Sequence, residues 1–330
     1  MSIRASRRIA ALWFAAFLSL TTTGISQTSS KAPQTSTPLK TNDHLNLTIT
    51  VINKKGDFVT GLQRDNFLVS FDKEPAKIVD FSAADVPLSV GILVDVSASV
   101  ADPGSKRAAR KLITFLQQAL KSFQGTSNKA NEYFLLAFNN QPQLLLDWTS
   151  DVNPLIDALS VVQPKGTTAL YDACYLALDK VQHGHNPKRV LLLISDGVDT
   201  NSTYYLNQVR EALKESDVLL YSANLAGDLA AGSSLGFEGQ QILNELSAIS
   251  GGMSFYKQEG VRLKESDAAS VFEIIATELG QQYSVVIQLP GSVNGKWHKI
   301  KIKVNSSAGV RGENKNLRVR TRQGFYLNHR

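Results

Sequence analysis

The chain has 330 residues, of which 43% are hydrophobic, so it is long enough for about two domains with a sizeable buried core. A charged fraction of 19%, with 22 Gly and 10 Pro, excludes a disordered or collagen-like chain. The single cysteine excludes an intramolecular disulfide and a cysteine-based zinc site. The formal net charge of +6 is unevenly spread, because residues 296–330 hold ten Lys and Arg against one acid, Glu313.

The N-terminus has the pattern of a secretory signal. Arg4, Arg7 and Arg8 precede an apolar stretch at 9–20, and a run of small and polar residues follows as far as Ser26. We therefore predict a signal peptide at 1–26 and a flexible linker at 27–43. The apolar stretch is shorter than the roughly 20 residues that a membrane span needs, so no span is expected after cleavage. The alternative is an uncleaved anchor, and in either case the protein is exported to the periplasm, the outer envelope or the medium.

The apolar pattern changes twice along the chain. Residues 45–51 alternate with period two, which is typical of a half-buried strand, and short strand-like runs follow as far as residue 81. Residues 88–94 are almost continuously apolar, as expected for a strand buried on both faces of a parallel sheet. Further buried strands and amphipathic helices then alternate. This alternation predicts a doubly wound, mostly parallel α/β sheet of Rossmann-like type.

Strand patterns return after a last predicted helix at 268–279. The early strands are too few to form a comfortable domain alone, so we expect the late strands to complete them. The α/β domain, predicted at 87–281, would then be inserted into a small β-sandwich domain. Two separate segments of the chain would form this β-domain, an N-terminal one at 45–84 and a C-terminal one at 283–326.

Oxygen-bearing side chains follow the ends of these predicted elements. Asp95, Ser97 and Ser99 lie at the carboxyl end of the first buried strand, where open α/β sheets bind ligands. Thr168 stands in a Gly-Thr-Thr-Ala-Leu-Tyr-Asp stretch that opens a helix, and Asp196 stands in a Ser-Asp-Gly sequence that ends a strand. Oxygen ligands without His or Cys favour a hard cation, Mg²⁺ above all.

These five residues, in this order, resemble the metal-ion-dependent adhesion site (MIDAS) of the von Willebrand factor type A (VWFA) family. The segments 59–67 and 320–326 are similar to those of a secreted bacterial subfamily of the acidobacterial type. The resemblance implies that Ser97, Ser99 and Thr168 bind Mg²⁺ or Mn²⁺ directly, while Asp95 and Asp196 bind it directly or through water. It also implies a free metal position for an Asp or Glu carboxylate of a partner protein, and hence a role in cell adhesion or protein binding.

Enzymatic activity is not expected. The G-x-S-x-G match at 232–236 lacks a strand directly before it, so it indicates a flexible loop rather than a catalytic serine. Phosphatases that use an aspartyl nucleophile usually carry a second carboxylate two residues on, and Ser97 stands in that position. A hydrolase that uses the same metal is the less favoured interpretation.

The basic C-terminal strands offer an alternative function. Two sets of basic residues alternate with other residues along strand-like segments, and each set predicts one charged strand face: Lys299, Lys301 and Lys303, and then Arg318, Arg320 and Arg322. Such a face is either merely solvated or binds a polyanion such as an anionic surface, as in a structural envelope protein. Stacking aromatic residues are not interleaved between them, which argues against nucleic acid.

Other polar features are expected to be structural. Asp199 is a candidate N-cap for a helix at 203–214, and Cys174 lies on the apolar face of a predicted helix as a buried, inert thiol. His183 and His185 form a solvated loop, because a third zinc ligand is missing nearby in the sequence.

Overall fold

The structure is a computed structural model that describes residues 44–100, 106–224, 234–256, 265–289, 296–305 and 317–326. These ranges belong to one compact unit, Thr41–Arg330. The predicted signal peptide at 1–26 and the linker at 27–43 lie outside the described residues. Within the described ranges, no helix is both long and apolar enough to cross a membrane.

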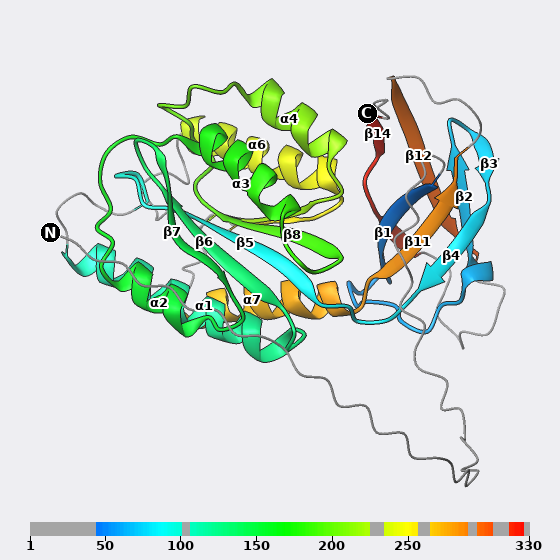
Figure 1. Cartoon of the computed structure of the whole chain (residues 1–330), viewed down its shortest axis with the longest axis horizontal. Helices are drawn as coiled ribbons and strands as arrows, with labels where there is room; N and C mark the ends of the chain where they lie inside the picture. The colour runs from blue at the N-terminus through cyan, green and yellow to red at the C-terminus, as the bar shows by residue number, and fades with distance from the viewer. Residues whose placement is uncertain are drawn as a thin grey trace, which may run out of the picture. The chain divides into compact units, whose positions relative to one another are not determined.

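A six-stranded, mostly parallel sheet forms the centre of the α/β region, in the order β10-β9-β8-β5-β6-β7 (Figure 1). Every neighbouring pair is parallel except β6 and β7. The predicted fold class, a mostly parallel α/β sheet accompanied by a β-rich region, is therefore confirmed. The strands span Leu88–Asp95 (β5), Glu132–Phe138 (β6), Pro142–Thr149 (β7), Lys188–Ile194 (β8), Leu219–Asn224 (β9) and Ser254–Tyr256 (β10).

Helices cover both faces of this sheet, which explains why its central strands are apolar on both sides. One face packs against α1 (Lys106–Thr126), α2 (Asn153–Ser160) and α7 (Glu265–Gly280). The other face packs against α3 (Leu170–Gln182), α4 (Leu206–Glu215) and α6 (Ser234–Ser250). All eight residues of β5 are buried, as its continuous apolar sequence predicts.

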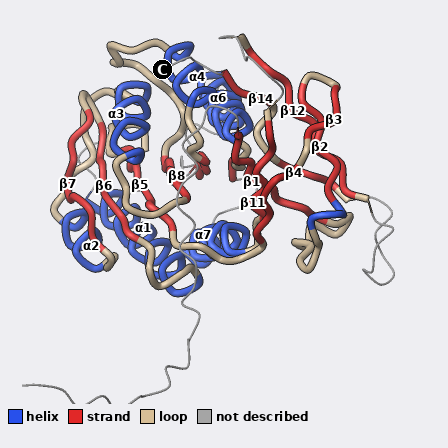
Figure 2. The backbone as a smooth tube through the Cα atoms, turned by 45° about the vertical axis from the view of Figure 1, so that its right-hand side comes forward, coloured by secondary structure: helices blue, strands red, loops and turns tan. Residues whose placement is uncertain are grey.

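Two four-stranded antiparallel sheets bring the N-terminal and C-terminal segments together (Figure 2). One sheet has the order β13-β1-β11-β4 and the other the order β14-β12-β2-β3. Their apolar faces share one core, which includes Leu47, Phe71, Val285 and Ile302. The strands are β1 (His44–Ile52), β2 (Phe67–Phe71), β3 (Glu74–Ala76), β4 (Ile78–Ser82), β11 (Tyr283–Gln288), β12 (Trp297–Val304), β13 (Arg318–Arg320) and β14 (Gly324–Tyr326), and a short 3-10 helix, Arg64–Asn66, precedes β2.

Two of the predicted local structures differ from the observed ones. The stretch at 234–236, expected in a flexible loop, forms the first turn of α6. The helix expected at 203–214 is α4, which begins only at Leu206, because Asp172 Oδ1 accepts hydrogen bonds from the amides of Thr203 and Tyr204 and holds both in the preceding loop. Local sequence signals do not reveal such a contact from another helix.

The arginines at 318, 320 and 322 do not form one charged solvent face, which corrects the sequence-based expectation. Arg318 is exposed, but Arg322 is buried and donates hydrogen bonds to the carbonyl oxygens of Ser216 and Lys214, at 2.8 and 2.6 Å. Arg320 Nη2 donates a hydrogen bond to Glu278 on α7. The two guanidinium groups thus join the C-terminal strands to helices α4 and α7. The alternating sequence pattern is the same for arginines that make such contacts and for arginines that face solvent.

The proposed domain boundaries can be tested by removing the C-terminal strands. A chain that ends at residue 281 lacks β11, the strand that pairs with both β1 and β4. We expect residues 45–84 to become sensitive to protease while the segment 87–281 stays protected, because the early strands lose most of their shared core. Limited proteolysis with mass spectrometry checks this. Continued protection of residues 45–84 would place the boundary elsewhere.

Candidate functional site

The candidate site lies where the order of the sheet changes direction. Strand β5 has β6 on one side and β8 on the other, so the chain leaves β5 in one direction and later returns on the opposite side. Ligands of open α/β sheets bind in the crevice beyond the strand ends at such a point. Asp95 is the last residue of β5, and Asp196 follows β8 by two residues.

Asp95 is buried and held on both carboxylate oxygens. Its Oδ1 accepts a hydrogen bond from the amide of Ser97 at 2.9 Å, and its Oδ2 accepts one from Ser195 Oγ at 2.7 Å. Burial raises the pKa of Asp95 to about 6; hydrogen bonds from Ser97 and Ser195 oppose this shift, and the charge of Asp196 adds to it. The two carboxylates are therefore close enough to interact electrostatically.

The two serines that follow Asp95 lie side by side. Ser97 is buried and Ser99 is exposed, and their Oγ atoms are 3.0 Å apart. The same turn is fastened to the loop before α3, since the Ala98 amide donates to Gly166 O at 3.1 Å and the Lys165 amide donates to Val96 O at 2.9 Å. These hydrogen bonds bring the Asp95 turn next to the segment that carries Thr168.

Thr168 is buried directly before α3, whereas the neighbouring Thr167 is exposed. The Thr168 amide donates to Thr200 Oγ1 at 2.9 Å, and the Thr168 carbonyl accepts the amides of Thr200 and Asn201 at 2.9 and 3.0 Å. The Thr167 hydroxyl instead donates to Asn140 Oδ1 at 3.0 Å. The backbone of Thr168 is thus fixed by the loop that follows Asp196.

Asp196 carries the clearest unsatisfied group at this site. The residue is buried, and its Oδ1 accepts the amide of Val198 at 3.0 Å. Among the described residues, its Oδ2 is buried and has no hydrogen-bond partner. Buried polar atoms are nearly always paired, so this carboxylate oxygen beside a second carboxylate has the chemistry of a cation ligand.

Two glycines position Asp196. Gly197 has a φ of +83°, and a Cβ there would lie 2.2 Å from Gly239 O on α6; a Cβ on Gly239 would lie 2.4 Å from Asp196 O. Only glycine at both positions lets α6 pack directly against the turn after β8. The turn, and with it the Asp196 carboxylate, is held from both sides.

Several contributors were not predicted from the sequence. Ser195 donates a hydrogen bond to Asp95, and the Thr200 hydroxyl accepts one from the Thr168 amide. The position of Ser195 next to Asp196 was a signal for the first residue, and the sequence held no signal for the second. Asp199 is a helix cap, as expected, but for α3 rather than α4, because its Oδ1 accepts the Leu170 amide at 2.8 Å. The reason is that α3 and the loop after β8 meet at this edge of the sheet.

The other chemically suggestive side chains have structural environments. Cys174 is buried on α3, and burial raises its pKa to about 12. His185 Nδ1 lies 2.8 Å from Glu132 Oε2, and His183 Nδ1 lies 3.0 Å from Asp179 O. Within the described segments of the chain, no group of three or more His, Cys, Asp or Glu side chains could hold a metal ion.

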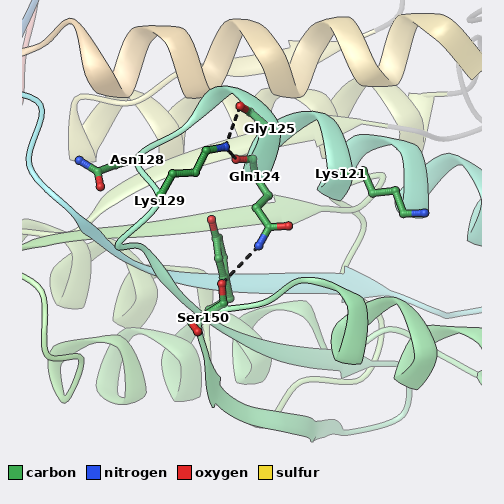
Figure 3. Close-up of a pocket in the computed structure, with 7 residues that line it drawn as sticks. Lys121, Gln124, Gly125, Asn128, Lys129 and Ser150 are labelled. Atoms are coloured by element: carbon green, nitrogen blue, oxygen red, sulfur yellow. Dashed lines mark hydrogen bonds between the residues drawn. The ribbon is translucent and has the colours of Figure 1, made fainter.

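A cavity of about 190 Å³ lies elsewhere, between the end of α1 and the start of β6 (Figure 3). Its polar groups already have partners: Lys129 Nζ donates to the carbonyls of Gln124 and Gly125, each at 2.9 Å, and Gln124 Nε2 donates to Ser150 O at 3.2 Å. This cavity is at the amino edge of the sheet, at the opposite end of β6 from the candidate site. It adds no residue to that site.

An open, mostly parallel sheet with carboxylates and hydroxyls at the switch in strand order defines the class by its fold: a doubly wound α/β domain. The model of the von Willebrand factor type A domain family matches residues 90–198. The chain therefore contains a von Willebrand factor type A domain.

Solved structures of low sequence identity resemble the chain. The vWF domain of the type V pili tip protein Mfa5 from Porphyromonas gingivalis is 14% identical, with a TM-score of 0.46 over 64% of this chain and 99% of that one. A von Willebrand factor type A protein from Catenulispora acidiphila is 11% identical, with a TM-score of 0.46 over 87% and 72%. The PilB minor pilin from Streptococcus sanguinis is 13% identical, with a TM-score of 0.45. The match covers 61% of this chain and 63% of the pilin. No curated protein matches the sequence.

Proposed function

We propose that the protein is an exported binding module that recognises an acidic group on a partner protein through a divalent cation. Asp95, Ser97, Ser99, Thr168 and Asp196 would hold the cation, Mg²⁺ or Mn²⁺. The buried, unpartnered Oδ2 of Asp196 is the observation that carries this proposal. The donor set fits a hard cation, which prefers carboxylate and hydroxyl oxygens.

The chain's own contacts prepare these ligands before anything binds. Ser195 Oγ and the Ser97 amide fix the Asp95 carboxylate, and the Thr200 side chain and backbone fix the backbone of Thr168. Rigid ligands lose little conformational entropy on binding, which supports affinity for a small ion. Two buried carboxylates that lie close enough to repel each other are also stabilised by a positive charge placed between them.

The exposure of Ser99 beside the buried Ser97 supports access from the surface. When bound, a divalent cation held by two carboxylates and neutral hydroxyls would offer a positively charged position to a carboxylate from a partner. The side chains described at the carboxyl edge offer hydroxyl and carboxylate oxygens as ligands. His185, which contacts Glu132, lies at the opposite, amino edge of the sheet, so it does not serve as a base at this site. We therefore favour binding over hydrolysis. Export rests on the signal-like pattern at 1–26.

Titration calorimetry with Mg²⁺ and Mn²⁺ tests the site. We expect one binding event that Asp196→Ala abolishes and that Thr168→Val weakens about tenfold or more, because the valine keeps the shape and removes one oxygen ligand. Thr167→Val is the matched control, since its hydroxyl faces Asn140 instead, and it should bind as the unchanged chain does. Equal binding by the chains with Thr168→Val and Thr167→Val would refute this metal site.

Partner recognition is tested by capture on the immobilised chain from an envelope fraction, with and without chelator. Capture that chelator removes, that Mg²⁺ or Mn²⁺ restores and that Thr168→Val abolishes supports the proposal. Capture that resists chelator and falls with salt would assign recognition to a charged surface instead.

A further inference from the structure

The outward face of β12 presents one tryptophan and three lysines in a single line. Trp297, Lys299, Lys301 and Lys303 are all exposed, while Ile300 and Ile302 between them are buried in the sandwich core. Alternate residues of a strand lie about 6.5–7 Å apart on one face. The three lysine side chains therefore leave the strand in a regular row, with the Trp297 side chain at one end.

The neighbouring strands do not balance this charge. Lys299, Lys301 and Lys303 lie opposite Gly324, Ser70 and Leu68 in the sheet register. Pairs of opposite charge across strands stabilise sheets, and like charges along one strand repel each other. No described residue on this outward face of β14, β12, β2 and β3 is acidic. Besides the row, the residues on this face are Tyr326, Gly324, Ser70, Leu68 and Pro75.

The adjacent acid, Asp72, is already engaged. Its Oδ1 accepts the backbone amide of Lys299 at 2.8 Å, and its Oδ2 lies 2.6 Å from His298 Nδ1. His298 in turn stacks on Phe71 with ring centroids 4.9 Å apart. Asp72 thus fixes the β2–β3 turn against β12 through a backbone amide and a histidine ring rather than through a lysine ammonium group. Among the residues that the structure describes, no carboxylate forms a salt bridge with Lys299, Lys301 or Lys303.

The ring of Trp297 is fixed at the end of the row. It is 37% exposed, and its centroid lies 5.2 Å from that of Tyr326 and 5.4 Å from Lys214 Nζ. A Cβ on Gly324 would lie 2.6 Å from Trp297 Cζ2, so glycine makes the space that the ring fills. A ring held in place offers apolar contact to a ligand at a low cost in entropy.

We propose that this row is a docking surface for a linear acidic polysaccharide that lies along β12. Its carboxylates would pair with Lys299, Lys301 and Lys303, and the C–H face of one sugar would pack on Trp297. Anionic membranes usually bind clusters of about four to eight basic residues, and the row has three. Single-stranded nucleic acid requires several stacking rings, and the row has one. A narrow line of charge that ends in one ring best matches a charged sugar chain.

Binding of the full chain to polygalacturonate, measured by calorimetry in EDTA at several salt concentrations, tests the proposal. EDTA removes any contribution of the metal site. We expect the combined change Lys299→Gln, Lys301→Gln and Lys303→Gln to weaken binding about tenfold or more and to flatten its salt dependence. The matched control changes three exposed lysines elsewhere, Lys54→Gln, Lys111→Gln and Lys121→Gln, and alters the net charge equally. It should weaken binding about twofold at most.

Trp297→Ala separates the sugar contact from charge. It should weaken binding about threefold or more at high salt, where the lysine contribution is screened, and leave the salt dependence unchanged. Equal losses in the two triple variants would overturn the proposal, as would absence of binding by the unchanged chain. Binding to phosphatidylglycerol vesicles or to single-stranded DNA without binding to polygalacturonate would also overturn it. Circular dichroism and thermal unfolding verify that each variant is folded.

Discussion

Replacing Glu278 by leucine should lower the free energy of unfolding by about 3–5 kcal/mol, because it removes the counter-charge of a partly buried guanidinium. Glu278 is 1% exposed and accepts hydrogen bonds from Thr50 Oγ1 at 2.8 Å, from Tyr221 OH at 2.6 Å, and from Arg320 Nη2. All three donors would lose this acceptor at once, as would Gln282 Nε2, which donates to the same oxygen at 3.3 Å. Urea unfolding measures the change.

Two variants make this result interpretable. Glu273→Leu removes an exposed acid from the same helix and should change stability by no more than about 0.5 kcal/mol. Adding Arg320→Met to Glu278→Leu should recover some of the loss, since the orphaned charge disappears. A loss below about 1 kcal/mol for Glu278→Leu would mean that water satisfies Arg320 and the two hydroxyls.

The Glu278 cluster also joins the antiparallel sheet that contains β1 and β13 to the α/β region. Thr50 belongs to β1, Tyr221 to β9, Glu278 to α7 and Arg320 to β13. Because these four elements meet in one hydrogen-bonded group, we expect the described structure to unfold in a single transition. Loss of the cluster should split this transition, as weakly coupled units open separately.

Patterns that depend on local sequence and strand order were predictable. The continuous apolar run at 88–94 became the fully buried β5, because a strand covered by helices on both faces has no polar side. The polar residues after strands converged at the carboxyl edge, because parallel strands all end there. Their chemical role as metal ligands stays a prediction.

Features that depend on contacts between distant segments were not predictable. Strand β7 lies at the sheet edge and is half-exposed, and its apolar run of three leucines at 144–146 is shorter than the runs of the central strands. Arg322 follows Arg320 at the spacing of a solvated strand face, but its side chain is buried and donates hydrogen bonds to carbonyl groups at the end of α4. The pairing of Asp199 with α3 likewise depends on two loops that meet only in the folded chain.

The ionisation of Asp95 should make the metal-free chain less stable as pH rises. Burial raises the pKa of this carboxyl from its ordinary value of 3.8 to about 6 in the folded state, so the folded chain binds a proton more tightly than the unfolded one. The stabilising contribution is complete below about pH 4 and is lost as pH rises through 6. A shift of about two units corresponds to about 3 kcal/mol.

Urea unfolding in EDTA at pH 4, 5, 6 and 7 measures this effect as the difference between the unchanged chain and Asp95→Asn. The carboxyl groups that both chains share cancel in this difference, and the amide of the variant stays neutral. The asparagine variant should therefore gain on the unchanged chain by about 2.5 kcal/mol between pH 4 and pH 7. Asp157→Asn, at an exposed position on α2, is the control and should show no such gain.

If a cation occupies the site, Mg²⁺ at pH 7 should restore stability to the unchanged chain more than to Asp95→Asn, because ionised Asp95 then meets a positive charge. Parallel pH curves for the two chains would show that Asp95 is hydrated rather than buried.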